Sequence, residues 1–253
     1  MIGVVVVTHN SAKYLQTCLS SLYDNLKLLE ESSMVVVVDN ASRDDGVAFV
    51  HQFFSRAQLI ENKENVGFSR AVNQGAQVCF KKGCEELLIL NPDTKVERGA
   101  LAEMLKVLRA GEKRAIVQPL LTRMSDPRLV SSWGNEYRGL GLVLCGGGGV
   151  SIENAKRKTK NNKLRDRQIG FASGACMLIR SEVWKKLKGF DERYFLYFED
   201  SDFCRRVRQA FLEVWLAPQA RVQHDHYWSL SPRKWWWRLR GWMRFIPSPS
   251  SSV

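Results

Sequence analysis

The sequence predicts an α/β fold in which a mostly parallel central sheet carries helices on both faces. Short runs of aliphatic residues alternate with segments whose apolar residues recur at helical spacing. The first run, Ile2–Thr8, is almost entirely β-branched, which is typical of a strand buried on both faces. Because crossover helices join successive parallel strands, this alternation indicates a parallel sheet between two helical layers.

The expected elements can be placed along the whole chain. Strands are expected at Ile2–Thr8, Met34–Val38, Gln58–Ile60, Glu86–Leu90, Ala115–Gln118, Phe171–Ile179 and Glu213–Leu216. Helices are expected from Leu15 to Leu26 and at Arg43–Phe54, Phe68–Phe80, Gly99–Leu108, Ser181–Leu187 and Asp202–Ala210. Residues 122–168 are rich in glycine and then in basic residues, so we expect a long mobile segment with a short hairpin there.

The composition is that of an ordinary globular protein. The chain has 253 residues, enough for one domain or one domain with a small appendage. No apolar run approaches the roughly 20 residues of a membrane-spanning helix, and the opening run has no signal-peptide features, so we expect a cytosolic protein. None of the six cysteines forms a C-x-x-C pair, which favours reduced, packed thiols over zinc ligands or disulfides.

The net charge of +12 is concentrated in two places. Residues 153–167 hold seven Lys/Arg and two acids, and residues 233–244 hold five Lys/Arg and no acid. A basic chain with interleaved tryptophans is one way to bind nucleic acid, which leaves a nucleic-acid or anionic-surface module as an alternative to an enzyme. Nucleic-acid binding would place a basic stripe across the folded domain, however, rather than in one loop and one tail.

Three expected strands end in polar clusters, at Thr8-His9-Asn10, Asp39-Asn40 and Asn91-Pro92-Asp93. Carboxyl ends of parallel strands lie at one edge of a sheet, where such folds bind their ligands. Two common nucleotide motifs are excluded. The chain has no G-x-x-x-x-G-K-[ST] loop, and its nearest approach to G-x-G-x-x-G, at Gly139, fails at the last position.

Taken together, the motifs resemble those of the family 2 glycosyltransferases of the GT-A fold. In their detailed sequences they resemble the rhamnosyltransferase-like branch. The similarity runs from residue 2 to about 229, ending at His224 and Ser229. The matching segments are V-V-V-T-H-N at 5–10, V-V-D-N-A-S at 37–42, N-V-G-F at 65–68, L-I-L-N-P-D-T at 88–94, G-A-C-M-L-I-R at 174–180, G-F-D-E at 189–192 and F-L-Y-F-E-D-S-D-F-C-R at 195–205.

The resemblance implies a GT-A domain over residues 1–228, with a nucleotide-sugar-binding half (1–120) and an acceptor and catalytic half (121–228). It assigns six residues to the donor, namely Thr8, Asn10, Asp39, Asn40, Asn73 and Asp93. Asp39 can accept a base or ribose hydrogen, but it could equally cap the helix expected from Arg43. Thr8 and Asn10 could likewise serve as helix caps.

Asn91-Pro92-Asp93 occupies the place of the family's D-x-D metal motif, which implies a divalent cation, Mg²⁺ or Mn²⁺, at the donor diphosphate. Asn91 departs from that motif. One carboxylate, Asp93, still suffices, because Mg²⁺ takes its other ligands from phosphate and water. A plain N-P-D turn is the alternative. His224 matches the family's C-terminal histidine near the metal or diphosphate, although His226 lies close by in the sequence.

By the same resemblance, Asp200 is the base that takes a proton from the acceptor hydroxyl. Glu199 and Asp202 are expected to be structural or to orient the acceptor, and Gly174 and Ala175 to let the acceptor approach the backbone. The alternative for the acidic run is a solvated turn that caps the following helix. Packing explains Gly174 and Ala175 equally well.

Residues 229–253 form a basic, Trp-rich tail with a Pro/Ser end that we expect to be disordered. Trp and Arg together favour a membrane–water interface, so the tail is expected to attach the protein peripherally to a membrane. The alternative is a helix that packs its tryptophans on the domain. The basic stretch at 153–167 could meet a lipid diphosphate or form a solvated loop.

The sequence therefore predicts an inverting, metal-dependent glycosyltransferase in cell-surface polysaccharide synthesis. It would move a sugar, such as rhamnose or another hexose, from a nucleoside-diphosphate sugar to a glycan or polyprenyl-diphosphate-linked saccharide. We expect it at the inner face of the cell membrane, with no nucleic-acid partner. A nucleotidyltransferase is disfavoured, because Thr8-His9-Asn10-Ser11 is not the Gly-rich basic loop that such an enzyme needs.

Overall fold

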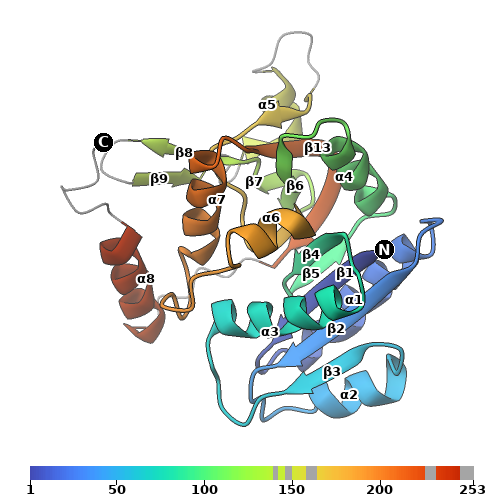
Figure 1. Ribbon diagram of the computed structural model, residues 1–253. Helices are drawn as coiled ribbons and strands as arrows, with labels where there is room; N and C mark the ends of the chain where they lie inside the picture. Colours follow the sequence, from blue (N-terminus) through green and yellow to red (C-terminus); the bar gives the residue numbers. More distant parts are fainter. Residues whose placement is uncertain (139–141, 146–149, 158–163, 226–231, 246–253) are drawn as a thin grey trace.

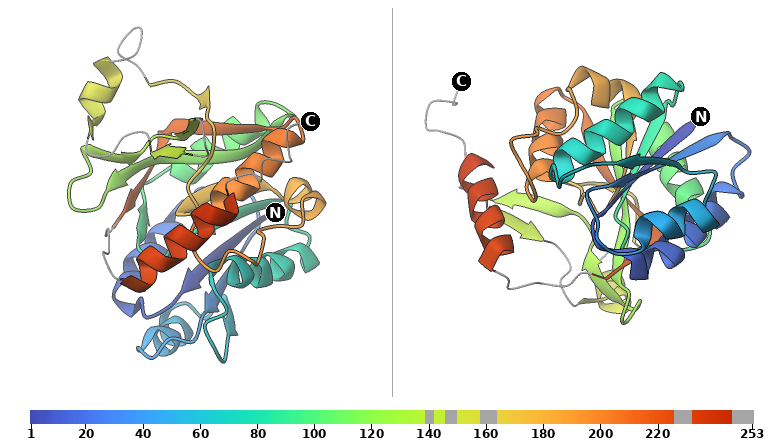
Figure 2. Two further views of the ribbon diagram at one scale, coloured as in Figure 1. Left: turned by 90° about the vertical axis from the view of Figure 1, so that its left-hand side faces the viewer. Right: turned by 90° about the horizontal axis from the view of Figure 1, so that it is seen from below.

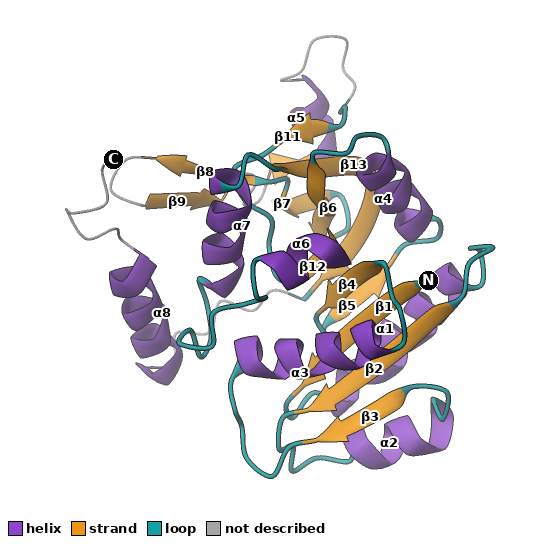
Figure 3. Ribbon diagram, in the orientation of Figure 1, coloured by secondary structure: helices purple, strands orange, loops and turns teal. Residues whose placement is uncertain are grey.

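A computed structural model describes residues 1–138, 142–145, 150–157, 164–225 and 232–245. One large sheet lies at the centre with helices on both faces (Figures 1 and 3). Its main path runs β10-β7-β6-β12-β4-β1-β2-β3, and β13 pairs with β6 and joins β5 and β11 to the sheet. Within the described residues, no helix is both long enough and apolar enough to cross a bilayer.

The first half of the sheet is parallel. The strands β1 (Ile2–Thr8), β2 (Ser33–Asp39), β3 (Gln58–Glu61) and β4 (Glu86–Leu90) all run in one direction. The second half is mixed. There β12 (Cys176–Arg180) lies antiparallel between β4 and β6 (Arg114–Arg123), whereas β13 (Glu213–His224) runs parallel to β6 and antiparallel to β5 (Thr94–Val96). The predicted fold class is confirmed. β6 includes residue 120, where the nucleotide-sugar-binding half is expected to end, so the two expected halves of the domain share this strand.

Helices cover both faces of the sheet, so β1 is buried on both sides. Val4 and Val6 lie in one core with residues of α1 (Ala12–Leu26) and α4 (Ala100–Arg109). Val5 and Val7 lie in a second core with residues of α3 (Phe68–Lys81), α6 (Ser181–Lys186) and α7 (Glu199–Gln209). The remaining helix of the N-terminal half, α2, spans Gly46–Phe53. Burying each of these valines stabilises the fold by about 1.5–3 kcal/mol.

The expectation of a long mobile segment at 122–168 is wrong for most of that range. The chain there adds β7 (Leu129–Ser132) and β10 (Val150–Ser151) to the edge of the sheet, and α5 (Ile152–Arg157) follows. β11 (Arg167–Gln168) pairs with β13. The short hairpin is confirmed as β8 (Asn135–Arg138) and β9 (Leu142–Cys145). Part of the basic stretch at 153–167 lies outside the described residues.

Several expected boundaries shift, and those of α7 and β13 affect the site. The helix expected from Arg43 begins at Gly46. α7 begins at Glu199 rather than Asp202, because Phe198 adopts a left-handed conformation with φ 71° and the helix starts directly after it. β13 continues past Leu216 to His224. Cys18, Cys79, Cys84, Cys176 and Cys204 are buried free thiols, as the spacing predicts.

Within the tail, residues 232–245 form the helix α8 (Pro232–Phe245), and the expected disordered end lies outside the described residues. α8 stands apart from the sheet and beside the segment that leads into α7 (Figures 1 and 2). Trp237 stacks on Phe195 with ring centroids 4.3 Å apart, and Phe245 is buried against Phe198. One face of the tail helix therefore packs on the domain.

Candidate active site

A cleft of about 780 Å³ opens at the carboxyl ends of β1 and β2. Its walls come from five parts of the chain: the end of β1, the end of β2, the loop after β3, the segment before α7, and α8. The lining residues are His9, Asn10, Ala41, Ser42, Arg43, Lys63, Glu64, Asn65, Phe195, Leu196 and Trp237.

The strand ends beside this cleft carry two buried polar atoms without hydrogen-bond partners. Thr8 and Asp39 are paired in the register of β1 and β2. The Thr8 hydroxyl and Oδ1 of Asp39 are buried and unpartnered, while Oδ2 of Asp39 accepts from the Ser42 backbone N–H at 3.0 Å. Asp39 therefore closes a turn and does not cap the helix, which begins only at Gly46. A buried group left without a partner costs about 1–3 kcal/mol, which favours a ligand in this position.

Asn10 joins the two strand ends. Its side-chain oxygen accepts from the Arg43 backbone N–H at 2.8 Å, and its own N–H donates to Ser42 Oγ at 2.9 Å. Asn10 and Ala41 both have positive φ, 52° and 61°. Such conformations cost about 1–3 kcal/mol each in non-glycine residues and cluster at functional sites. The exposed Asn10 side chain lies in the cleft wall, where sequence reasoning places a donor contact.

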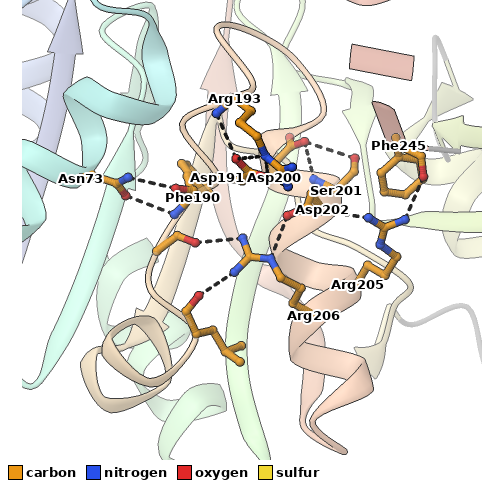
Figure 4. Close-up of polar contacts among 12 residues, drawn as sticks. Asn73, Phe190, Asp191, Arg193, Asp200, Ser201, Asp202, Arg205, Arg206 and Phe245 are labelled. Atoms are coloured by element: carbon orange, nitrogen blue, oxygen red, sulfur yellow. Dashed lines mark hydrogen bonds and ion pairs between the residues drawn. The ribbon is translucent and has the colours of Figure 1, made fainter. Parts of the chain in front are cut away.

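Two predicted donor residues make internal contacts instead. The Asn40 amide donates to Asn65 Oδ1 at 2.9 Å and accepts from the Val66 N–H at 3.0 Å, so it fixes the loop after β3. The Asn73 amide bonds twice to the Phe190 backbone, at 2.9 and 3.1 Å (Figure 4). The structure does not bring Asn73 into the cleft lining, and it gives both amides a role in holding loops.

Asp93 and His224 are brought together by the pairing of β5 with β13, in which Thr94 lies opposite His224. Nε2 of His224 is 3.3 Å from Oδ1 of Asp93. That carboxyl oxygen is buried and accepts no hydrogen bond, and the His224 ring is nearly buried. Among the described residues, no cluster of three or more His, Cys, Asp and Glu could hold a metal. The pair supplies one carboxylate and one imidazole.

Asp200 is held firmly at the start of α7. Its Oδ2 accepts from the Gly174 backbone N–H at 2.9 Å, and its Oδ1 accepts from the Ser201 N–H at 2.6 Å. Burial raises the pKa of Asp200 above its usual value, although these hydrogen bonds oppose that effect. The residue after Gly174, Ala175, lies just before β12, and its carbonyl accepts from the Asn91 N–H at 2.9 Å. Gly174 and Ala175 thus connect Asp200 to the Asp93 loop.

The neighbouring acids differ in their surroundings. Glu199 is 5% exposed, and its Oε2 is buried without a hydrogen-bond partner. Burial, and then the charge of Asp200, raise the pKa of Glu199 well above its usual value. Asp202 pairs with Arg205 and Arg206 at 2.8 Å each (Figure 4). These two ion pairs hold Asp202 to residues of its own helix.

The chain bends sharply before these acids. Tyr197 and Phe198 are consecutive residues with positive φ, 70° and 71°. Sequence reasoning missed the part that α8 takes in the cleft wall. The run of tryptophans in the tail was the available signal for Trp237. No sequence signal marked the lining residues Lys63 and Glu64.

The fold and this set of strand-end groups define a GT-A-type glycosyltransferase. The family model for glycosyl transferase family 2 matches residues 3–188, so the chain belongs to that family. The family relationship does not favour the alternative of a nucleic-acid or anionic-surface module.

Two curated relatives are rhamnosyltransferases. The chain is 26% identical over 241 residues to the N-acetylglucosaminyl-diphospho-decaprenol L-rhamnosyltransferase of Mycobacterium tuberculosis, covering 88% of this chain and 76% of that protein. It is 23% identical over 261 residues to rhamnosyltransferase WbbL of Escherichia coli, covering 97% and 92%.

Two solved structures share the fold. GalNAc-T7, solved with UDP, GalNAc and Mn²⁺, aligns with a TM-score of 0.73 at 17% identity, over 97% of this chain and 47% of its own. The mannosyltransferase PcManGT of Pyrobaculum calidifontis, solved with GDP-Man and Mn²⁺, aligns with a TM-score of 0.64 at 19% identity, over 92% and 59%.

Proposed function

We propose that this glycosyltransferase moves rhamnose, or another hexose, from a nucleoside-diphosphate sugar to a hydroxyl of a polyprenyl-diphosphate-linked saccharide. The names of the relatives support the sugar and the acceptor class. The observation that carries the proposal is the Asp200 carboxylate, oriented by the Gly174 N–H at the sheet edge that also holds Asp93.

Asp200 acts as the base. The acceptor oxygen attacks the anomeric carbon from the side opposite the diphosphate, and the bond from that carbon to the diphosphate oxygen breaks, which inverts the configuration. The hydroxyl proton passes to the Asp200 carboxylate. Oδ2 accepts one backbone hydrogen bond in the structure, which leaves a lone pair for this proton. A raised pKa makes the carboxylate a better proton acceptor near neutral pH.

The donor occupies the cleft between the strand ends. The unpartnered Thr8 hydroxyl and Asp39 Oδ1, beside the cleft but not in its lining, would take hydrogen bonds with its base or ribose, and the lining residue Asn10 would contact it directly. Asn40 supports this site indirectly, since its amide holds Asn65 in the cleft lining.

Asp93 and His224 fit a divalent cation. Oδ1 of Asp93, which accepts no hydrogen bond, and the His224 imidazole form a donor pair that Mn²⁺ accepts more readily than Mg²⁺, which prefers oxygen ligands throughout. When bound there, the cation would neutralise charge on the departing diphosphate. The presence of Mn²⁺ in two structures of the same fold supports this assignment.

The lipid-linked acceptor places the reaction at a membrane. We infer that the protein works at its cytoplasmic face, where a water-soluble nucleotide sugar can meet an acceptor whose lipid lies in the bilayer.

A donor panel tests the proposal. dTDP-rhamnose, UDP-sugars and GDP-mannose are each screened for thermal stabilisation and for release of nucleoside diphosphate, with and without Mn²⁺. We expect one donor to stabilise the protein and to be consumed when a polyprenyl-diphosphate saccharide is added. If no donor stabilises the protein and none is consumed, the proposal is wrong.

A further inference from the structure

Helix α8 has two apolar faces, and only one of them is covered. Trp237, Gly241 and Phe245 follow one another four residues apart and face the domain. A Cβ at Gly241 would come within 2.9 Å of the Phe198 ring, so the helix lies close against this bend. Phe245 is 2% exposed, and its carbonyl accepts from Arg205 at 2.8 Å.

The other face is open to solvent. Trp235, Trp236, Leu239, Trp242 and Met243 recur at helical spacing on one side of α8, with Trp235 58% and Met243 57% exposed. Eight large apolar side chains are exposed among the described residues whose side chains are placed, and five of them are on this helix. Exposed apolar side chains gathered in this way mark an interaction site.

The charges around this face identify its partner. Residues 233–244 carry five Lys/Arg and no acid, and Arg240 and Arg244 are exposed. Tryptophan is favoured at the headgroup level of a bilayer, while arginine meets lipid phosphate. A 14-residue amphipathic helix with this composition is typical of one that lies in the plane of a membrane surface.

We infer that the exposed face of α8, formed by Trp235, Trp236, Leu239, Trp242 and Met243, docks on an anionic bilayer. The opposite face of the same helix supplies Trp237 to the cleft and packs on the bend before Asp200. Docking therefore sets the cleft at a fixed place relative to the lipid surface. The value of that placement for a lipid-linked acceptor rests on the proposed function, but the docking itself does not.

Vesicle flotation of the full chain tests the inference. Vesicles of phosphatidylcholine alone are compared with vesicles that also contain phosphatidylglycerol. The wild type is expected to float with the anionic vesicles, and less so at high salt. The double variant Trp235→Ser/Trp242→Ser should lose at least about tenfold in partitioning. Arg240→Gln should lose about fivefold on anionic vesicles and little on neutral ones.

Phe211→Ser is the matched control, because Phe211 is 86% exposed but lies outside α8. It should float like the wild type, and the circular dichroism of the double variant should match that of the wild type. The inference is overturned if the wild type stays unbound, if the double variant floats normally, or if the tryptophans serve to dimerise the chain or bind RNA instead. Flotation without sugar transfer from any donor would contradict the proposed function but would still support the docking surface.

Discussion

Nε2 of His224 lies 3.3 Å from Oδ1 of Asp93, at a point where β13 pairs with β5. The contact exists because β13 extends past Leu216, where the sequence pattern predicts its end, to His224. It brings His224, which lies beyond the family match over residues 3–188, to the loop that carries the predicted metal ligand Asp93.

If this pair holds the cation, His224→Gln should raise the Mn²⁺ concentration for half-maximal activity by at least about tenfold. Asp93→Asn should have a larger effect, since it removes the carboxylate. Mn²⁺ titrations of sugar transfer provide the measurement. The control is His51→Gln, because His51 is exposed on α2 and outside the cleft. Equal Mn²⁺ dependence in all variants would contradict the assignment.

Glu199 predicts a pH dependence of stability. Its pKa in the folded state is raised by burial, so between its ordinary value and the raised one the folded state binds more protons than the unfolded state. The free energy of unfolding should therefore fall as the pH rises through that window. Glu199→Gln removes this term, so the variant should lose less stability than the wild type between about pH 5 and pH 7.

Urea denaturation at both pH values checks the Glu199 prediction. Glu85→Gln is a suitable control, because the Glu85 side chain is 80% exposed. An identical loss of stability in the wild type and Glu199→Gln would show that the buried carboxyl does not titrate in this range.

Trp237 should act on donor binding. It stacks on Phe195 at 4.3 Å, and both rings line the cleft. We expect the donor base to stack on this pair. An aromatic contact contributes about 0.5–1.5 kcal/mol, so its loss in Trp237→Ala should raise the KM for the donor about three- to tenfold. The assay uses a water-soluble acceptor without lipid. Under those conditions Trp235→Ala, which changes a neighbouring exposed ring, should behave like the wild type. A normal donor KM in Trp237→Ala would show that α8 takes no part in binding the donor.

The fold of the N-terminal half was predictable because its signals are local. β1 is an uninterrupted buried run, and the polar residues that end β1, β2 and β4 follow from position alone. β7 and β10 were missed because they are short strands at the end of the sheet, where a strand carries little hydrophobic pattern.

The motifs identify the residue types of the candidate site, but not the contacts between them. Asp200 accepts a hydrogen bond from the Gly174 backbone, a contact that the motifs alone do not specify. Nothing in the sequence distinguishes Asn73, bound to the Phe190 backbone, from an amide that faces a ligand. That difference arises from tertiary packing. The same is true of Trp237, whose place in the cleft depends on how α8 docks on the bend at Tyr197 and Phe198.

Sugar transfer by Asp200→Asn is the most direct test of the central claim that this carboxylate is the base. The substitution keeps the size of the side chain and removes its ability to take a proton. We predict that the rate of transfer falls by about 10²- to 10⁴-fold, while thermal stabilisation by the donor and Mn²⁺ is unchanged. A transfer rate within a few-fold of the wild type would contradict the account.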